Sequence, residues 1–197
     1  MPCMKQVSNW PALGLGTWRM GENARMRRAE VAAVRQALDI GYRLIDSAEM
    51  YGDGGAEEVV GVALAEALRA GDCKREELTI VSKVLPSNAS RRGVIAACER
   101  SRQRLGIDTI DLYLLHWPGS HPLHETLQGF EQLRASGAIS QWGVSNFDLA
   151  AMKKLIALPD GDRCAPNQVY YSLGDRGMAF DLTPWQHQRT LPLMAYS

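Results

Sequence analysis

The sequence lacks any hydrophobic run long enough to cross a bilayer. Its longest apolar stretches, such as residues 59–65 and 110–115, are far shorter than the roughly 20 residues that a membrane helix needs. The first residues, Met1 to Lys5, contain no apolar segment followed by a cleavage site, so we expect no signal peptide. These absences favour a cytoplasmic protein that does not bind membranes.

The chain also lacks an excess of charge of either sign. Lys+Arg and Asp+Glu both number 22, so the formal net charge is zero. Proteins that bind nucleic acid or acidic lipid surfaces usually carry a basic patch, so we expect neither partner. Hydrophobic residues make up 46% and charged residues 22% of the chain, which is typical of a globular protein.

Cysteine pairs with metal-binding spacing are missing as well. The four cysteines are far apart and form no CxxC pair, which predicts free thiols in a reducing compartment. His121 and His124 lie close in sequence, but no acidic or cysteine cluster completes a ligand set. We therefore expect no bound metal. The cysteines are Cys3, Cys73, Cys98 and Cys164.

The sequence does show a strict alternation of short β-like runs with amphipathic segments of helical period. Seven β units, six of them followed by a helix, imply a parallel sheet. The predicted strands are residues 13–18, 43–47, 78–84, 110–116, 141–145, 167–171 and 193–196. The predicted helices include residues 28–40, 56–70, 91–105 and 123–135.

Local signals predict several helix ends. Gly41 and Gly106 suit the left-handed position just past a helix, and Asp148 could cap the helix that follows it. Thr183 and Pro184 are typical of an N-cap followed by the first helical residue. The arginines of the helix at 91–105 are expected to form a solvated face. They are Arg91, Arg92, Arg100, Arg102 and Arg104.

Two architectures compete for this alternation, an open doubly wound sheet and a closed (β/α) barrel. The first needs a GxGxxG fingerprint, but Arg19 stands where the third glycine should follow Gly14 and Gly16. Polar residues instead recur at the carboxyl ends of the strands, where barrel active sites lie, and this favours the barrel. They are Thr17, Asp46, Lys83, His116, Ser145, Asn146 and Gln168.

Three of these polar side chains form a chemically sensible set with a tyrosine that follows the second predicted strand. Tyrosine has an ordinary pKa of about 10, and a nearby ammonium such as that of Lys83 lowers the pKa. Asp46 could pair with Lys83, and a neutral His116 could orient a substrate oxygen. With Tyr51 the set suits a proton donor to a carbonyl that gains hydride. Taken singly, each residue also fits a structural role, as a buried ion pair, a loop aromatic or a core histidine.

With these residues in view, nearly the whole chain resembles the aldo-keto reductase family. In residues 49–57 (EMYGDGGAE) and 117–120 (WPGS), the likeness is greatest to the bacterial branch that reduces small aldehydes such as methylglyoxal. The motifs that carry the resemblance are residues 15–18 (LGTW), 45–52 (IDSAEMYG), 81–84 (VSKV), 108–118 (DTIDLYLLHWP), 143–147 (GVSNF), 167–168 (NQ) and 195–197 (AYS).

The resemblance implies reduction of small aldehydes or ketones to alcohols with NADPH, and NAD is not excluded. It implies that Tyr51 is the general acid, that Lys83 lowers its pKa, that Asp46 pairs with Lys83 and that His116 orients the carbonyl.

The resemblance also implies the positions of cofactor and substrate. Ser145, Asn146 and Gln168 would hold the nicotinamide carboxamide, and Tyr196 would stack on its ring. Thr17, Trp18 and Asp46 would flank the cofactor ribose. Plain packing is the alternative role for Trp18 and Trp117. The residues expected around the substrate are Trp18, Tyr51, His116 and Trp117.

The expected fold is a (β/α)8 TIM barrel that is incomplete, with about seven strands present. Residues 1–197 would form one catalytic domain that lacks the final strand and the C-terminal helices. Since the loop that binds the 2′-phosphate of NADP would be absent, the preference for NADPH rests on resemblance alone. We expect the isolated chain to be poorly stable, to associate and to have little activity. An inactive fragment and a cofactor-binding regulatory subunit of the same fold stay open as alternatives.

Overall fold

Seven parallel strands alternate with helices in the computed structural model, which describes residues 10–197. Cys3 and the segment Met1 to Lys5 lie outside the described residues. The strands are β1 (Gly14–Gly16), β2 (Leu44–Asp46), β3 (Thr79–Val84), β4 (Ile110–Leu115), β5 (Ile139–Ser145), β6 (Asn167–Tyr170) and β7 (Leu193–Tyr196). The α-helices are α1 (Arg27–Asp39), α2 (Gly55–Ala70), α3 (Arg91–Leu105), α4 (Leu123–Ala135), α5 (Leu149–Ile156) and α6 (Leu182–His187).

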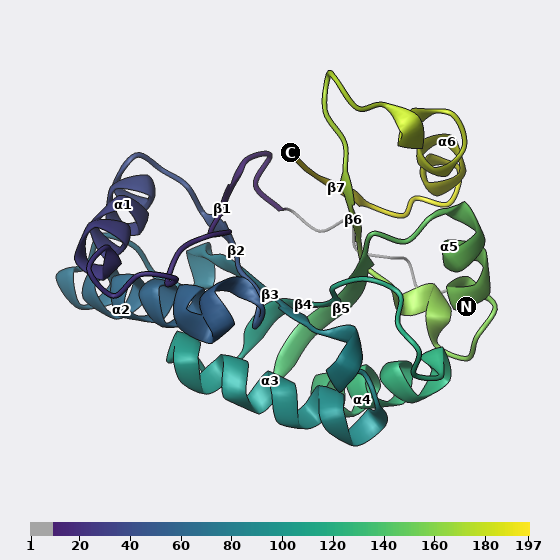
Figure 1. Ribbon diagram of the computed structural model, residues 1–197, viewed down its shortest axis with the longest axis horizontal. Helices are drawn as coiled ribbons and strands as arrows, with labels where there is room; N and C mark the ends of the chain where they lie inside the picture. The colour runs from purple at the N-terminus through teal and green to yellow at the C-terminus, as the bar shows by residue number, and fades with distance from the viewer. Residues whose placement is uncertain (1–9) are drawn as a thin grey trace.

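The sheet is curled, with its helices on the outer face. Each strand pairs in parallel with the next along the chain, in the order β1 to β7. Figure 1 shows the strands wrapping around a common interior while α1 to α6 line the outside. A doubly wound sheet would carry helices on both faces, so the prediction of an incomplete (β/α) barrel is confirmed.

Alternate residues of the strands point to different cores. In β4, Tyr113 and Leu115 belong to the large apolar cluster between sheet and helices, whereas Leu112 and Leu114 face the barrel interior. Leu44 and Val81 join the inner cluster from β2 and β3. By the same alternation Lys83 points inward and Ser82 points toward the helices.

Several predicted helix ends are confirmed, and one is wrong. Gly41 and Gly106 have φ of 101° and 65° just past α1 and α3. The side chain of Asp148 caps α5 by accepting from the main-chain N–H of Ala151. Thr183 is not the cap of α6, because the helix begins at Leu182, two residues before the predicted start at Pro184, and Asp181 caps it. The buried Thr183 hydroxyl then has no hydrogen-bond partner within the described chain.

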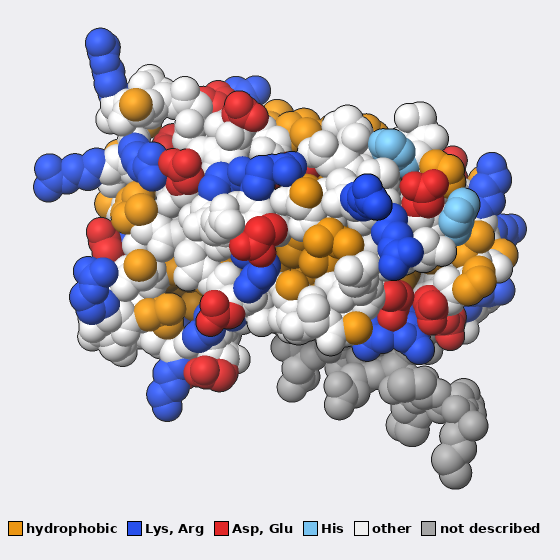
Figure 2. All heavy atoms as spheres, turned by 90° about the horizontal axis from the view of Figure 1, so that it is seen from below, with side chains coloured by type: hydrophobic (Ala, Val, Ile, Leu, Met, Phe, Trp, Pro, Cys, Tyr) orange, Lys and Arg blue, Asp and Glu red, His pale blue; other side chains and the backbone are white. Residues whose placement is uncertain are grey.

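Charges of both signs are interspersed over the outer surface. On the face seen from below in Figure 1, acidic and basic side chains neighbour one another without a broad patch of one sign (Figure 2). Among the helices of residues 10–197, none has the length and apolar character that a bilayer crossing needs.

The two outermost strands have only one neighbour each within the described residues. β1 pairs with β2 and β7 pairs with β6, but β1 and β7 do not pair with each other. Exposed strand edges associate with other edges, so we expect the 197-residue chain produced alone to self-associate at micromolar concentration. Sedimentation velocity would measure this, and a stable monomer would contradict the expectation.

Glu131 ties α4 to β5 and to the turn at Gly161–Arg163. Its carboxylate accepts from Trp142 Nε1 at 2.7 Å, from Arg134 at 2.7 Å and from Arg163 at 2.8 Å. Burial raises the pKa of Glu131, but the hydrogen bonds from Arg134 and Trp142 and the two arginine charges outweigh it and lower the pKa below 4.5.

Replacing Glu131 with glutamine should therefore lower the free energy of unfolding at pH 7 by about 1–2 kcal/mol, since charge-assisted hydrogen bonds are lost. A carboxyl whose folded pKa is depressed stabilises the fold above its ordinary pKa, and this contribution is lost as pH falls through the folded pKa. Urea unfolding should show the gap between wild type and variant shrinking below about pH 4.5. A gap that is independent of pH would contradict the assignment.

Candidate active site

The structure brings together the four side chains expected to do the chemistry. Asp46 ends β2, Lys83 lies in β3, His116 follows β4, and Tyr51 begins the short 3-10 helix η1 (Tyr51–Gly54). Lys83 Nζ lies 2.8 Å from Asp46 Oδ2 and 3.3 Å from Tyr51 Oη. The Tyr51 and His116 rings meet edge to face with centroids 5.6 Å apart. All four therefore share one site at the carboxyl ends of the strands.

Lys83 is fully buried, and all its donors have a use. It donates to Asp46, to Tyr51 Oη and, at 2.8 Å, to the main-chain oxygen of Ser47. The second carboxylate oxygen of Asp46 accepts from Gln168 Nε2 at 3.0 Å, which links β2 to β6 across the barrel. This network compensates the cost of burying an ammonium and fixes its position.

The turn after β2 needs glycine in order to present Tyr51. Gly52, Asp53 and Gly54 have φ of 57°, 53° and 90° in succession. A Cβ atom on Gly52 would lie 2.6 Å from the main-chain oxygen of Met20. The sequence Tyr-Gly-Asp-Gly thus permits a tight left-handed turn at the start of α2.

Tyr51 carries its proton at neutral pH. Burial raises its pKa above 10.0, and the charge of Lys83 together with the hydrogen bond from Lys83 opposes this rise, while Asp46 adds to it. Lys83 thus acts in the predicted direction, but it does not bring the pKa below the ordinary value. The ammonium donates to the phenol oxygen, which leaves the phenolic proton available to another acceptor.

His116 is a neutral imidazole at this site. Burial, and to a smaller extent the nearby charge of Lys83, together lower its pKa from 6.5 to about 3. Its Nδ1 atom is buried and has no hydrogen-bond partner within the described chain. A neutral imidazole can donate a hydrogen bond to a substrate oxygen without carrying charge.

NMR should show that the chemical shifts of the His116 ring do not change between pH 5 and pH 8. The variant His116→Gln, which lacks these signals, identifies them. Because the unfolded chain takes up this proton below pH 6.5 and the folded chain does not, stability should also fall as pH drops below 6.5. A titration midpoint of the folded protein near 6.5 would show that His116 is solvated and outside the site.

The residues expected to hold a nicotinamide lie beside these four. Asn146 has a left-handed φ of 59° just after β5, and its Nδ2 donates to the main-chain oxygen of His116 and to Ser145 Oγ, both at 3.1 Å. Its Oδ1 accepts from Tyr196 at 2.7 Å. Gln168 lies next to Ser145 on the adjacent strand β6, and Tyr196 is 39% exposed. Amide groups beside an exposed aromatic ring fit the carboxamide and ring of a nicotinamide.

The remaining predicted residues occupy two kinds of position. Thr17 is buried, and its hydroxyl donates to the main-chain oxygen of Asp46 at 3.0 Å. Trp18 is 65% exposed and Trp117 is 36% exposed, with the Trp117 ring 4.7 Å from that of His116. Neither tryptophan is therefore a residue of the buried core.

The sequence reasoning missed four residues that hold this site from behind. Glu49 and Glu57 are buried, and they form ion pairs with Arg100 and Arg104 of α3. The prediction that these two arginines lie on a solvated face is incomplete, because their side chains are 48% and 21% exposed but each also pairs with a buried carboxylate. No signal in the sequence distinguishes these two from the other three arginines of α3.

Comparison with known proteins decides the family. Residues 12–197 match the model of the aldo/keto reductase family. The chain belongs to this family.

Two relatives of this aldo/keto reductase are both named methylglyoxal reductases. Methylglyoxal reductase YeaE of Escherichia coli (strain K12) is 53% identical over 187 residues, which cover 95% of this chain and 63% of that protein. Methylglyoxal reductase DkgB of Escherichia coli O157:H7 is 34% identical over 165 residues, covering 82% of this chain and 57% of that protein. The chain thus spans about three fifths of the length of these relatives.

A solved structure shares the fold closely. The aldo/keto reductase from Klebsiella pneumoniae in complex with NADP and acetate has a TM-score of 0.89 and 50% sequence identity to this chain. The match covers 95% of this chain and 64% of that one.

Proposed function

We propose that the protein reduces small aldehydes and ketones, methylglyoxal among them, to alcohols with NADPH, and that Tyr51 is the general acid. The contact of 3.3 Å between Lys83 Nζ and Tyr51 Oη carries this proposal. It sets a phenol that has kept its proton against a buried ammonium, which stabilises the phenolate left after proton transfer.

Each side chain of the site then has one task. His116 donates a hydrogen bond to the carbonyl oxygen and orients it. Tyr51 transfers its phenolic proton to that oxygen, and Lys83 stabilises the resulting phenolate. Asp46 keeps Lys83 charged and in place. A bound nicotinamide would supply the hydride that the carbonyl carbon receives.

The site has side chains that could bind the nicotinamide ring, its carboxamide and the adjoining ribose of this cofactor. Ser145, Asn146 and Gln168 would hold the carboxamide, and Tyr196 would stack on the ring. Thr17, Trp18 and Asp46 would flank the ribose, while Trp18 and Trp117 would line the substrate pocket with Tyr51 and His116. The NADP complex of the Klebsiella pneumoniae enzyme supports NADPH as the cofactor.

Absorbance at 340 nm tests the proposal directly. We expect NADPH oxidation that depends on methylglyoxal or 4-nitrobenzaldehyde, slow in the 197-residue chain and faster in a version extended through an eighth strand. NADPH binding without carbonyl-dependent oxidation in either version would instead support a cofactor-binding regulatory subunit. Absence of both would support an inactive fragment.

A further inference from the structure

We propose that Glu49 and Glu57, which flank Tyr51 in the sequence, are positioning residues that fix the Tyr51 phenol against Lys83. The two carboxylates accept hydrogen bonds from residues before and after Lys83 in the chain. Each carboxylate also forms an ion pair with an arginine of α3. The inference rests on the proposed role of Tyr51 as proton donor, but its geometry can be tested without turnover.

Glu57 grips the strand just before Lys83. It lies in the first turn of α2 and is fully buried. One carboxylate oxygen accepts from the hydroxyl of Ser82, and the other accepts from Arg104 Nε at 2.6 Å. Because Ser82 points to the helices and Lys83 points inward, this bond fixes the strand directly behind the ammonium.

Glu49 grips the strand just after Lys83. Its main-chain N–H donates to the main-chain oxygen of Lys83 at 3.2 Å. Its carboxylate accepts from the N–H of Leu85 at 2.7 Å and from Asn88 Nδ2 at 2.9 Å. Arg100 reaches the other oxygen at 3.3 Å. Glu49 therefore joins the loop that carries Tyr51 to the exit of β3.

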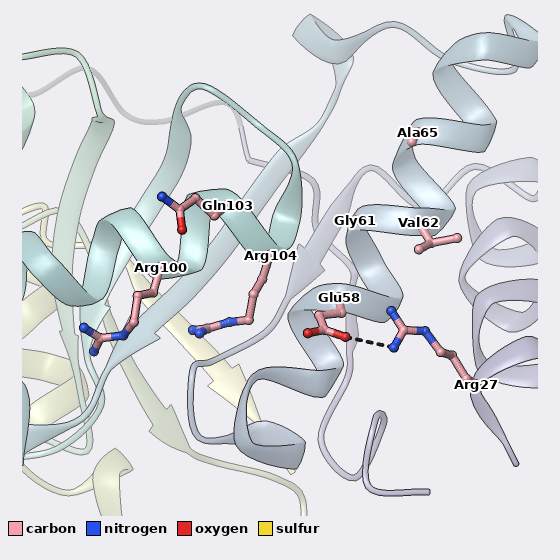
Figure 3. Close-up of a pocket in the computed structure, with 8 residues that line it drawn as sticks. All are labelled: Arg27, Glu58, Gly61, Val62, Ala65, Arg100, Gln103 and Arg104. Atoms are coloured by element: carbon pink, nitrogen blue, oxygen red, sulfur yellow. Dashed lines mark hydrogen bonds and ion pairs between the residues drawn. The ribbon is translucent and has the colours of Figure 1, made fainter. Parts of the chain in front are cut away.

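The two arginines come from successive turns of α3 and extend in the same direction (Figure 3). Arg104 also packs under the Tyr51 turn, since a Cβ atom on Gly54 would lie 2.6 Å from Arg104 Nε. A cavity of about 480 Å³ on the outer face is lined by both arginines. The Arg100 and Arg104 side chains are 48% and 21% exposed. Because they keep part of their contact with water, the desolvation cost of pairing them with buried carboxylates is smaller.

The buried ion pairs of Glu49 and Glu57 are confined to this part of the space between the sheet and the helices. Elsewhere the space between strands and helices is filled by apolar side chains such as Val59, Val60 and Ile80. An ion pair at such a position costs desolvation that an apolar residue avoids, so it is weak evidence for stability alone. It does fix geometry, because hydrogen bonds have direction and apolar contacts do not.

Kinetics supply the first test. Ser82→Ala and Glu57→Gln should lower kcat about tenfold while changing the KM for the carbonyl less than twofold, since misplacement of a reacting group by a fraction of an ångström affects the chemical step. Glu58→Gln is the matched control, because Glu58 is the next residue of α2 and pairs with the exposed Arg27. Equal effects at positions 57 and 58 would overturn the proposal.

Glu49 allows a graded comparison. Glu49→Gln keeps an oxygen that can accept from Leu85 and Asn88. It weakens only the pairing with Arg100, which is more exposed than the Arg104 that pairs with Glu57, so kcat should stay within about threefold of wild type. Glu49→Ala removes the acceptor and should lower kcat about tenfold. If the alanine and glutamine variants have the same kcat, the carboxylate does not act by these bonds.

The signal of Tyr51 in ¹³Cζ-tyrosine NMR supplies a test that needs no turnover. The chain has six tyrosines, and Tyr51→Phe identifies the signal of interest. We expect it to move in Ser82→Ala and Glu57→Gln and to stay in place in Glu58→Gln. Ser82→Ala removes a single oxygen and so keeps the test informative if Glu57→Gln fails to fold. An unmoved signal in folded Ser82→Ala would overturn the positioning role, whereas turnover by Tyr51→Phe would overturn the proposed function instead.

Discussion

Tyr51→Phe should lower kcat for methylglyoxal reduction by about 10²–10⁴-fold, the range that a positioned proton donor contributes. The substitution removes one oxygen atom, which contacts Lys83 Nζ at 3.3 Å. Since the ring and its edge-to-face contact with His116 remain, NADPH affinity and the free energy of unfolding should change little. Steady-state kinetics and fluorescence titration with NADPH measure the two effects separately.

Tyr42→Phe is the matched control for this prediction, because Tyr42 precedes β2 and lies at the opposite end of the strand from Asp46. Its kcat should equal that of the wild type. If Tyr51→Phe keeps more than a tenth of the wild-type kcat, another group donates the proton, and the assignment of Tyr51 is wrong.

Lys83→Met should have the second large effect, on stability as well as on kcat. The ammonium is fully buried and makes three hydrogen bonds, to Asp46, Ser47 and Tyr51. Methionine has a similar length but no donor, so it leaves the Asp46 carboxylate without its charge partner. Breaking a buried ion pair on one side costs roughly 3–5 kcal/mol of unfolding free energy. Urea unfolding at pH 7 measures this loss.

The double variant Lys83→Met with Asp46→Asn measures the interaction between these two residues apart from their other contacts. Removal of the orphaned charge should recover part of the lost stability, because the two residues are in direct contact and their effects are not additive. The kcat of the double variant should stay as low as that of Lys83→Met. Additive losses of stability would mean that the two residues do not act as a pair.

Much of the fold followed from the sequence because its signals are local. Hydrophobic periodicity predicted α3 and α4 over the same residues that the structure gives, Arg91–Leu105 and Leu123–Ala135. Strand ends were less well defined: β5 begins at Ile139, two residues before the prediction, and β1 covers only Gly14–Gly16. The ends of strands depend on the neighbouring strand, which a single sequence does not show.

The side chains of the candidate site that face the barrel interior could be predicted from the sequence, and the arginines of α3 that support them from the helix side could not. Asp46, Lys83 and His116 stand out because charged or titratable residues interrupt buried strands. Arg100 and Arg104 do not, because α3 carries five arginines that look alike in sequence. Which of them turns inward depends on how α3 packs beside α2, so the link from Arg104 to Glu57, 47 residues away, is visible only in the folded chain.

A crystal structure with NADP and acetate bound tests the central claim most directly, because the small carboxylate imitates a carbonyl substrate. We expect one acetate oxygen within hydrogen-bond distance of both Tyr51 Oη and a ring nitrogen of His116, with the nicotinamide beside Asn146 and Gln168. Acetate and nicotinamide bound away from Tyr51, Lys83 and His116 would contradict the claim that these residues form the site of carbonyl reduction.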